Sequence, residues 1–312
     1  MAEVTAQLVK ELRERTQAGM SDCKNALVEA GGDMDKAVEV ILKKGLAKTA
    51  KRAGAVATEG EVCAKVAADA KSGALVEVNI QTDFAARNEK FKAFAAAMAD
   101  IALGAPAGAA LDALPFPGAG KTVAEVRDEL IATIGEKIAV RRWAKADRAG
   151  KPGLVHAYVH LGGKIGALLE IETATDAVAA DAGVRKFADD AAMQIAAMAP
   201  LYLDRAEVPA SEVDKQKEIF VAQLREEPKP KPEAAWPKII EGKVNKWLTE
   251  ICLLDQESVL VAGQKIDQVR AEVAKAAGGE LKLVSFVRYE RGEGIEKKTD
   301  DFAAEVAKMA GG

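Results

Sequence analysis

The fold is decided by one stretch of the chain, Gly73-Ala74-Leu75-Val76-Glu77-Val78-Asn79-Ile80-Gln81-Thr82-Asp83-Phe84-Ala85-Ala86. Its apolar run, from Leu75 to Ile80, predicts a strand that ends at a polar turn. Thr82 and Asp83 are residue types that cap helices, and a helical pattern follows them, so we expect the strand to lead straight into a helix. Phe84 then lies in the first helical turn, where an aromatic ring is easily presented and poorly buried.

The same stretch recurs 93 residues later, without the ring. Gly166-Ala167-Leu168-Leu169-Glu170-Ile171 repeats its first half, and Thr175-Asp176 repeats its Thr-Asp pair. Where the first copy has Phe84, the second copy has Ala177. We interpret the Thr-Asp pair as a requirement of the fold, and Phe84 as an addition that needs a functional explanation.

The repeat extends to both sides of this stretch and indicates two related halves. An alternating strand precedes each copy, as in Val62-Cys63-Ala64 and Val155-His156-Ala157, and a helix and a closing strand follow it. The closing strands, Ile138-Ala139-Val140 and Leu281-Lys282-Leu283, are 143 residues apart, so the second copy carries an insertion. Strands and helices in this order predict an α+β protein with two related α/β subdomains built on small antiparallel sheets.

We predict five parts along the chain. An N-terminal three-helix bundle that serves as a docking module occupies 1–54, and the first core subdomain occupies 55–149. The second core subdomain comprises 150–198 and 263–291, and it is interrupted by the insertion at 199–262. Two amphipathic patterns flank a proline-rich tip in that insertion, which predicts a helical hairpin. The remaining part, 292–312, is a C-terminal module whose sequence predicts an amphipathic helix.

The N-terminal bundle has readable helix boundaries. Val4, Leu8 and Leu12 share one face of a first helix. Ser21 and Asp33 are the expected N-caps of a second and a third helix, and Gly45 is the expected end of the third.

Composition and charge exclude several classes of function. The net charge is −4, and an acidic balance disfavours nucleic acid as the main partner. No apolar run approaches the length of a membrane span, and residues 1–5 do not resemble the start of a signal peptide. The scattered residues Cys23, Cys63 and Cys252 are typical of reduced thiols. We therefore expect a cytoplasmic protein that has no cofactor, no metal, no membrane partner and no direct contact with nucleic acid.

Two motifs that suggest an enzyme fail on closer reading. Gly118-Ala119-Gly120-Lys121-Thr122 resembles the end of a phosphate-binding loop, but Pro115 stands where the motif needs glycine, and no buried strand precedes it. His156 and His160 share one face of a strand without the third ligand of a zinc site or a marked nucleophile. We expect Thr122 to cap a helix, and we expect no catalytic residues.

Two long signatures resemble the bacterial translation elongation factor Ts family. One is Leu12-Arg13-Glu14-Arg15-Thr16-Gln17-Ala18-Gly19-Met20-Ser21-Asp22-Cys23-Lys24-Asn25-Ala26-Leu27, and the other is Glu77-Val78-Asn79-Ile80-Gln81-Thr82-Asp83-Phe84. The resemblance implies an N-terminal bundle of the ubiquitin-associated type, a protruding helical hairpin and a C-terminal helix. It also implies a guanine-nucleotide exchange factor that promotes GDP release from elongation factor Tu.

The resemblance assigns roles to individual residues. Thr82, Asp83 and Phe84 would enter the GTPase domain of elongation factor Tu near its Mg²⁺ and phosphate site. We expect Asp83 to hold the helix start as its cap and so to place the ring of Phe84. The docking contacts that it implies are made by Lys10, Arg13 and Met20 on that domain and by His160 on a second domain. A rival interpretation is a non-catalytic scaffold that uses the helical hairpin for oligomerisation, and homodimerisation stays open under either interpretation.

Overall fold

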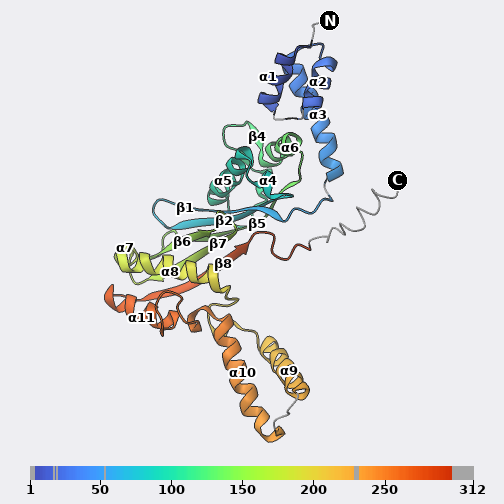
Figure 1. Cartoon of the computed structure of the whole chain (residues 1–312). Helices are drawn as coiled ribbons and strands as arrows, with labels where there is room; N and C mark the ends of the chain where they lie inside the picture. Colours follow the sequence, from blue (N-terminus) through green and yellow to red (C-terminus); the bar gives the residue numbers. More distant parts are fainter. Residues whose placement is uncertain (1–3, 17, 19, 53, 228–231, 297–312) are drawn as a thin grey trace.

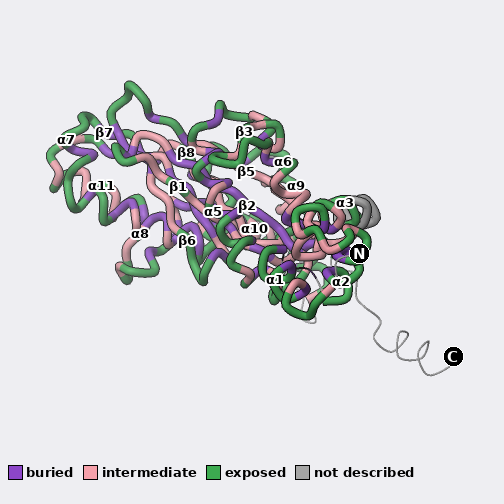
Figure 2. Tube along the Cα trace, turned by 90° about the horizontal axis from the view of Figure 1, so that it is seen from above, coloured by how far each residue is buried: buried purple, intermediate pink, exposed green. Residues whose placement is uncertain are grey.

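The computed structural model describes residues 4–16, 18, 20–52, 54–227 and 232–296. Figure 1 shows the N-terminal helices at one end of the molecule, the main sheets with their helices in the middle, and a helical hairpin that projects at the other end. Figure 2, seen from above, shows buried residues gathered along the strands and exposed residues along the outer helices. The α+β fold class predicted from the sequence is confirmed.

The N-terminal bundle consists of α1 (Ala6–Thr16), α2 (Met20–Glu29) and α3 (Met34–Arg52). Its core is made by the buried side chains of Leu12, Cys23, Ala26, Leu27, Ala37 and Ile41. Asp33 caps α3, because its carboxylate accepts hydrogen bonds from the backbone N–H groups of Asp35 and Lys36, both at 3.1 Å.

Two predicted boundaries in this bundle are wrong. α2 begins at Met20, so Ser21 lies inside the helix rather than at its N-cap. α3 continues through Gly45 to Arg52. A glycine inside a helix costs only about 1 kcal/mol, which is less than tertiary packing can supply. α3 packs against α6 (Val123–Ile134), and this contact accounts for its extra turns.

The first subdomain is a three-stranded antiparallel sheet covered by helices. Its strand order is β1 (Glu59–Val66), β2 (Ser72–Ile80) and β5 (Ile138–Asp147). The covering elements are α4 (Asp83–Ala86), α5 (Glu89–Gly104), η1 (Leu111–Ala113), β3 (Pro115–Phe116), β4 (Lys121–Thr122) and α6. Phe91 and Met98 of α5 are fully buried against the sheet, since the apolar face of this helix turns toward β2.

The second subdomain repeats this plan. Its strand order is β6 (Gly153–His160), β7 (Ile165–Thr173) and β8 (Leu281–Glu290), with α7 (Asp176–Ala180), α8 (Ala182–Met198) and α11 (Ile266–Ala276) as its helices. The strand pairing shifts register between Glu77 and Val78 in one sheet, and between Glu170 and Ile171 in the other. These irregularities are 93 residues apart, so the sequence repeat is also a structural repeat.

The two sheets pack on each other through equivalent positions. The contact is a buried cluster of Val62, Leu75, Ala146, Val155 and Leu168. A Cβ added to Gly73 would lie 2.7 Å from Cγ1 of Val155, and a Cβ added to Gly166 would lie 2.6 Å from Cγ1 of Val62. Glycine is therefore required at both places because the opposite sheet occupies the space that a side chain would need.

The insertion forms a hairpin of α9 (Ala210–Glu226) and α10 (Trp236–Ile251), with the short helices η2 (Arg205–Glu207), η3 (Glu233–Ala235) and η4 (Leu253–Asp255) around it. Part of the predicted proline-rich tip, 228–231, lies outside the described residues. At the base of the hairpin, Arg205 pairs with Asp255 at 2.6 Å and donates a hydrogen bond to Asn245 at 3.0 Å. The hairpin is thus tied to the second subdomain at one end only (Figure 1).

A shortened chain should keep its folded core. The first copy closes its sheet without an insertion, so removing Ser211 to Thr249 and joining the ends by a short linker should leave a cooperative thermal transition. Scanning calorimetry of the deletion variant measures this. A broad, non-cooperative melt would show that the hairpin is part of the core, and would argue against the proposed boundaries at 199 and 262.

A buried carboxylate joins the first sheet to the segment that follows β8. Glu77 is fully buried, and it accepts hydrogen bonds from Asn79 (3.0 Å), Arg141 (3.0 Å) and the backbone N–H of Gly292 (2.8 Å). Arg142 also donates to Glu77 and reaches the backbone carbonyl of Glu290. Residues 290–293 are therefore fixed across the first sheet. The C-terminal helix predicted beyond them lies outside the described residues.

Candidate functional site

Phe84 is the outstanding surface feature of the first subdomain. Its side chain is 81% exposed, which makes it the most exposed large apolar side chain in the part of the chain that the structure describes. Six residues on, Lys90 belongs to a different helix, because α4 has only four residues and Asn88 caps α5 anew. The ring therefore stands on a short, separate turn of helix, as its place in the sequence predicted.

The helix that carries Phe84 is capped by Thr82, not by Asp83. Thr82 has extended backbone angles, and its hydroxyl accepts a hydrogen bond from the backbone N–H of Ala85 at 3.2 Å. Asp83 is already the first helical residue, where its carboxylate pairs with Arg87 at 3.0 Å. The expectation that Asp83 holds the helix start is therefore wrong, because only the residue before the first turn can cap it.

Two residues that sequence reasoning missed complete the surroundings of Phe84. The guanidinium of Arg87 lies 5.9 Å from the centre of the Phe84 ring, within the range of a cation–π contact. Glu136, in the turn before β5, accepts hydrogen bonds from the backbone N–H of Thr82 (2.9 Å) and from its hydroxyl (2.7 Å). Arg87 could have been found from its spacing of four from Asp83. Glu136 lies 54 residues from Thr82, and no local pattern pairs them.

The second copy provides an internal comparison. Thr175 caps α7 through a hydrogen bond from the backbone N–H of Val178 at 3.3 Å, and Ala177 is exposed, as Phe84 is. Asp176 is bound differently from Asp83. It pairs with Lys71 of the first subdomain, and the hydrogen bond from this lysine holds the pKa of Asp176 below its ordinary value. The two carboxylates thus share a sequence position but not a set of contacts.

The predicted docking residues of the N-terminal bundle lie on its surface. Lys10 and Arg13 are exposed on α1, and Lys10 is 3.9 Å from Glu14 on the next turn. Met20, at the start of α2, is 62% exposed although methionine is usually buried. They belong to a different element from α4, and Figure 1 shows the bundle beyond the helices of the first subdomain.

His160 ends β6 and is exposed. Its Nδ1 is 2.9 Å from the hydroxyl of Tyr158, and the two rings stack with centres 5.8 Å apart. The turn after it reaches β1, because the backbone N–H of Val62 donates to the carbonyl of Gly163 at 2.8 Å. Three residues earlier in β1, Glu59 pairs with Ile80, the residue that comes two before Thr82. The strand β1 therefore connects the surroundings of His160 to those of Phe84.

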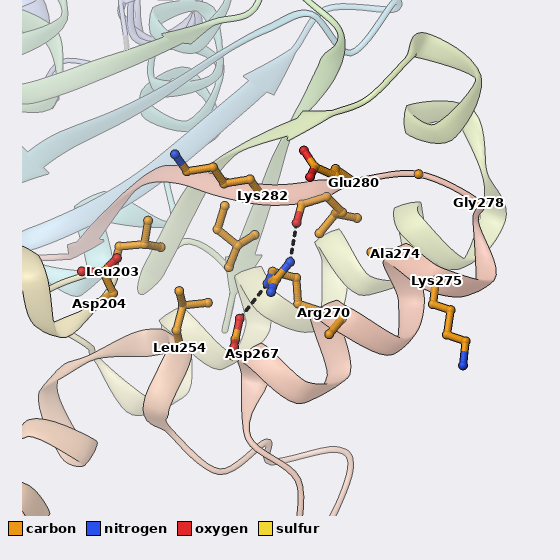
Figure 3. A pocket seen from close by; sticks show the side chains of 14 residues that line it. Leu203, Asp204, Leu254, Asp267, Arg270, Ala274, Lys275, Gly278, Glu280 and Lys282 are labelled. Atoms are coloured by element: carbon orange, nitrogen blue, oxygen red, sulfur yellow. Dashed lines mark hydrogen bonds and ion pairs between the residues drawn. The ribbon is translucent and has the colours of Figure 1, made fainter.

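A surface cavity lies away from these residues. It occupies about 590 Å³ between α11 and β8. Figure 3 shows Arg270 reaching across it, where it pairs with Asp267 and donates to the carbonyl of Leu281, both at 2.7 Å. None of the site residues predicted from the sequence lines this cavity. Its one arginine already has partners in the protein, so the cavity offers no argument for a ligand.

The structure also places the motifs that were set aside. Thr122 caps α6 as predicted, in a capping box with Glu125, and Lys121 pairs with Glu129. His156 lies 3.0 Å from Asp189. Among the described residues, there is no group of three or more histidine, cysteine, aspartate or glutamate side chains arranged for a metal ion. Nor does any helix in that part of the chain have the length and apolar character needed to cross a membrane.

Comparison with known proteins shows the family. Residues 81–293 match the model of the family described as Elongation factor TS. The chain is 46% identical over 309 residues to elongation factor Ts of Clostridium perfringens, with 99% of each chain covered. It is 47% identical over 311 residues to that of Symbiobacterium thermophilum, covering 100% of this chain and 99% of the relative.

The chain belongs to the elongation factor Ts family. Elongation factor Ts of Rhodospirillum centenum, 45% identical over 317 residues, is matched along all of both chains. Membership makes the chain a translation elongation factor and, within protein biosynthesis, an exchange factor. Thr82, Asp83, Phe84 and His160 lie inside the region matched by the family model. Lys10, Arg13 and Met20 lie outside it, in the part covered by the full-length relatives.

Proposed function

We propose that this protein is a guanine-nucleotide exchange factor that promotes GDP release from elongation factor Tu. The observation that carries the proposal is the 81% exposed ring of Phe84, held on a capped four-residue helix where the second copy has only Ala177. An exposed aromatic ring on a fixed support loses little conformational entropy when a partner buries it, because the ring is already ordered. In this proposal the ring enters the GTPase domain of elongation factor Tu near its phosphate and Mg²⁺ site.

Asp83 has a distinct role in this proposal. Its carboxylate is half exposed beside Phe84 and pairs with Arg87, the residue that follows α4. A negative charge brought close to the nucleotide phosphates repels them, and this repulsion grows as water is excluded from the contact. Ring and carboxylate together weaken the hold of the partner on GDP and Mg²⁺. No covalent step is involved, so the protein acts as an exchange factor rather than as an enzyme.

Phe84 needs help from the docking surfaces. Burying one aromatic ring contributes about 1.5–3 kcal/mol, which corresponds to roughly a tenfold to hundredfold change in an equilibrium constant. The further contacts are proposed to come from Lys10, Arg13 and Met20 on the GTPase domain, and from His160 on a second domain of elongation factor Tu. Since this partner works in translation, the proposed location is the cytoplasm, with no membrane or nucleic-acid contact.

Linkage between the two ligands tests this function. A factor that lowers the affinity for GDP must itself bind the nucleotide-free partner more tightly than the GDP-bound partner, by the same ratio. Isothermal titration of elongation factor Tu with and without GDP measures the ratio. Equal affinity for the two forms would overturn the proposal, and would favour a scaffold that uses the projecting hairpin for oligomerisation.

The corrected cap changes what substitutions at this helix should do. Thr82→Ala removes the cap and should lower the free energy of unfolding by about 0.5–2 kcal/mol. Asp83→Ala breaks only an exposed pair with Arg87 and should lower it by less than about 1 kcal/mol. With either variant, elongation factor Tu should release GDP more slowly than with the wild-type protein. Thr82→Ala acts through the placement of the ring, and Asp83→Ala acts through the lost charge. Urea titration and GDP-release rates check this, and a larger loss of stability in Asp83→Ala would restore Asp83 as the cap.

A further inference from the structure

The turn before the closing strand meets the start of the short helix differently in the two copies. In the first copy, a side chain bridges the gap. Glu136 accepts from the backbone N–H of Thr82 at 2.9 Å and from its hydroxyl at 2.7 Å. A hydroxyl has one hydrogen to donate, so this bond leaves its lone pairs facing the backbone N–H of Ala85, which they cap at 3.2 Å. The carboxylate thereby fixes both the backbone and the capping group of α4.

In the second copy the two segments touch directly. The offset of 143 between the closing strands places Gly279 where the first copy has Glu136. A Cβ added to Gly279 would lie 2.7 Å from Cγ2 of Val178 and 3.2 Å from the Cβ of Ala174. The backbone N–H of Ala174 donates to the carbonyl of Glu280 at 2.9 Å. A glutamate at Gly279 would have no room, because α7 occupies the space.

In the first copy a second side chain also takes the place of a direct contact between backbones. Gln81 and Lys137 occupy the positions of Ala174 and Glu280. There the backbone N–H of Lys137 donates to the side chain of Gln81 at 2.8 Å, in place of a backbone-to-backbone bond. α4 is thus held through the side chains of Glu136 and Gln81, whereas α7 is packed onto the turn itself. The copy that carries the exposed ring is the copy with these bridges.

We propose that Glu136 is a positioning residue that sets the pose of α4 and so presents Phe84 to the partner. The inference rests on the proposed exchange function and adds to it a residue that touches neither nucleotide nor partner. Without the carboxylate, Thr82 loses the two hydrogen bonds that hold the start of α4 at its distance from the turn. The ring is then no longer held at its observed angle. The rate at which elongation factor Tu releases GDP in the complex should therefore fall, while docking by the other surfaces is kept.

The test compares Glu136→Ala, Phe84→Ala and the double variant in GDP release from elongation factor Tu, with the full chain and a fluorescent GDP. Glu136→Ala should lower the maximal release rate about tenfold, within the range of coupling between contacting residues. The concentration that gives half the maximal rate should stay the same. In the Phe84→Ala background the same change should have no further effect, since there is no ring left to position.

The chain contains a matched control. Glu125 accepts from the backbone N–H of Thr122 at 2.7 Å and from its hydroxyl at 3.0 Å, so it supports a threonine cap in the same way, on a helix without an exposed ring. Glu125→Ala should melt at a similarly lowered temperature and keep the full release rate. Glu136→Gln serves if Glu136→Ala does not fold, because it keeps the side-chain volume. The two groups of Thr82 donate to different oxygens of Glu136, and the amide replaces one of these acceptors by an NH₂ group.

The outcomes separate the two proposals. An unchanged release rate in Glu136→Ala, or an equal further loss in the Phe84→Ala background, would overturn the role of Glu136 alone. Equal losses of rate in Glu125→Ala and Glu136→Ala would overturn it as well, by showing a general effect of stability. A Phe84→Ala variant with the wild-type rate would overturn the proposed entry of the ring into the partner, and the role of Glu136 with it. A wild-type protein that leaves GDP release at its spontaneous rate would overturn the proposed exchange function itself.

Discussion

Replacing Phe84 by alanine should remove most of the acceleration of GDP release and leave the stability of the protein unchanged. The ring is 81% exposed, so its loss should alter the free energy of unfolding by less than about 0.5 kcal/mol. The second copy already folds with Ala177 at this position. The release rate should fall roughly tenfold to a hundredfold, the equivalent of about 1.5–3 kcal/mol for one buried ring. Thermal melting and stopped-flow fluorescence measure the two effects on the same samples.

Two further variants make this result specific. Leu260→Ala removes another exposed apolar side chain, 49% exposed and near the end of the insertion, and should leave the release rate unchanged. Phe91→Ala removes a fully buried ring and should cost about 3–5 kcal/mol of stability. If Phe84→Ala costs as much stability as Phe91→Ala, the ring is structural and its assignment to the exchange site is wrong.

Replacing Glu77 by alanine should produce a large loss of stability. The carboxylate is fully buried and holds Arg141, Arg142 and the backbone N–H of Gly292. Removing one partner of a buried charge cluster costs about 3–5 kcal/mol, and we expect about 3 kcal/mol because both arginines are partly exposed and can be hydrated. Urea titration measures the change. Glu170, at the equivalent position of the second copy, is less buried, and Glu170→Ala should cost less; the opposite order would contradict this account of Glu77.

The contribution of Glu77 should also depend on pH. Burial acts to raise its pKa, but the hydrogen bonds from Gly292, Asn79, Arg142 and Arg141 outweigh burial and hold the pKa below the ordinary 4.5. A depressed pKa in the folded state stabilises the protein above the unfolded pKa, and this stabilisation is lost as pH falls through the folded pKa. The gap in stability between wild type and Glu77→Gln should therefore narrow as the pH is lowered below about 4.5.

Much of this arrangement was predictable because the chain contains its own comparison. The repeat at a spacing of 93 residues predicted two similar sheets. Because the second copy has Ala177 at the position of Phe84, the sequence also predicted that the fold does not need the ring. The exposure of Phe84 follows from its place in the first turn of a capped helix that comes directly after a strand. Family resemblance, rather than any pattern of charge or spacing, supplied the roles of Lys10, Arg13, Met20 and His160, and these stay proposals.

Contacts between distant segments were beyond the sequence. The sequence led us to expect the cap at Asp83, because aspartate and threonine are both common N-cap residues. Only the backbone angles show that Thr82 is the N-cap. Glu136 meets Thr82 across 54 residues through a turn whose path depends on the whole sheet. Gly45 was expected to end a helix that continues because α6 packs against it. At Gly45 a tertiary contact outweighed a local preference.

The central claim is that this protein accelerates the release of GDP from elongation factor Tu. The most direct measurement is stopped-flow release of a fluorescent GDP from that partner, with excess unlabelled nucleotide, at increasing concentrations of the wild-type protein. We predict a release rate that rises with the concentration of the protein and then saturates, far above the spontaneous rate. A release rate equal to the spontaneous one at every concentration would contradict the account.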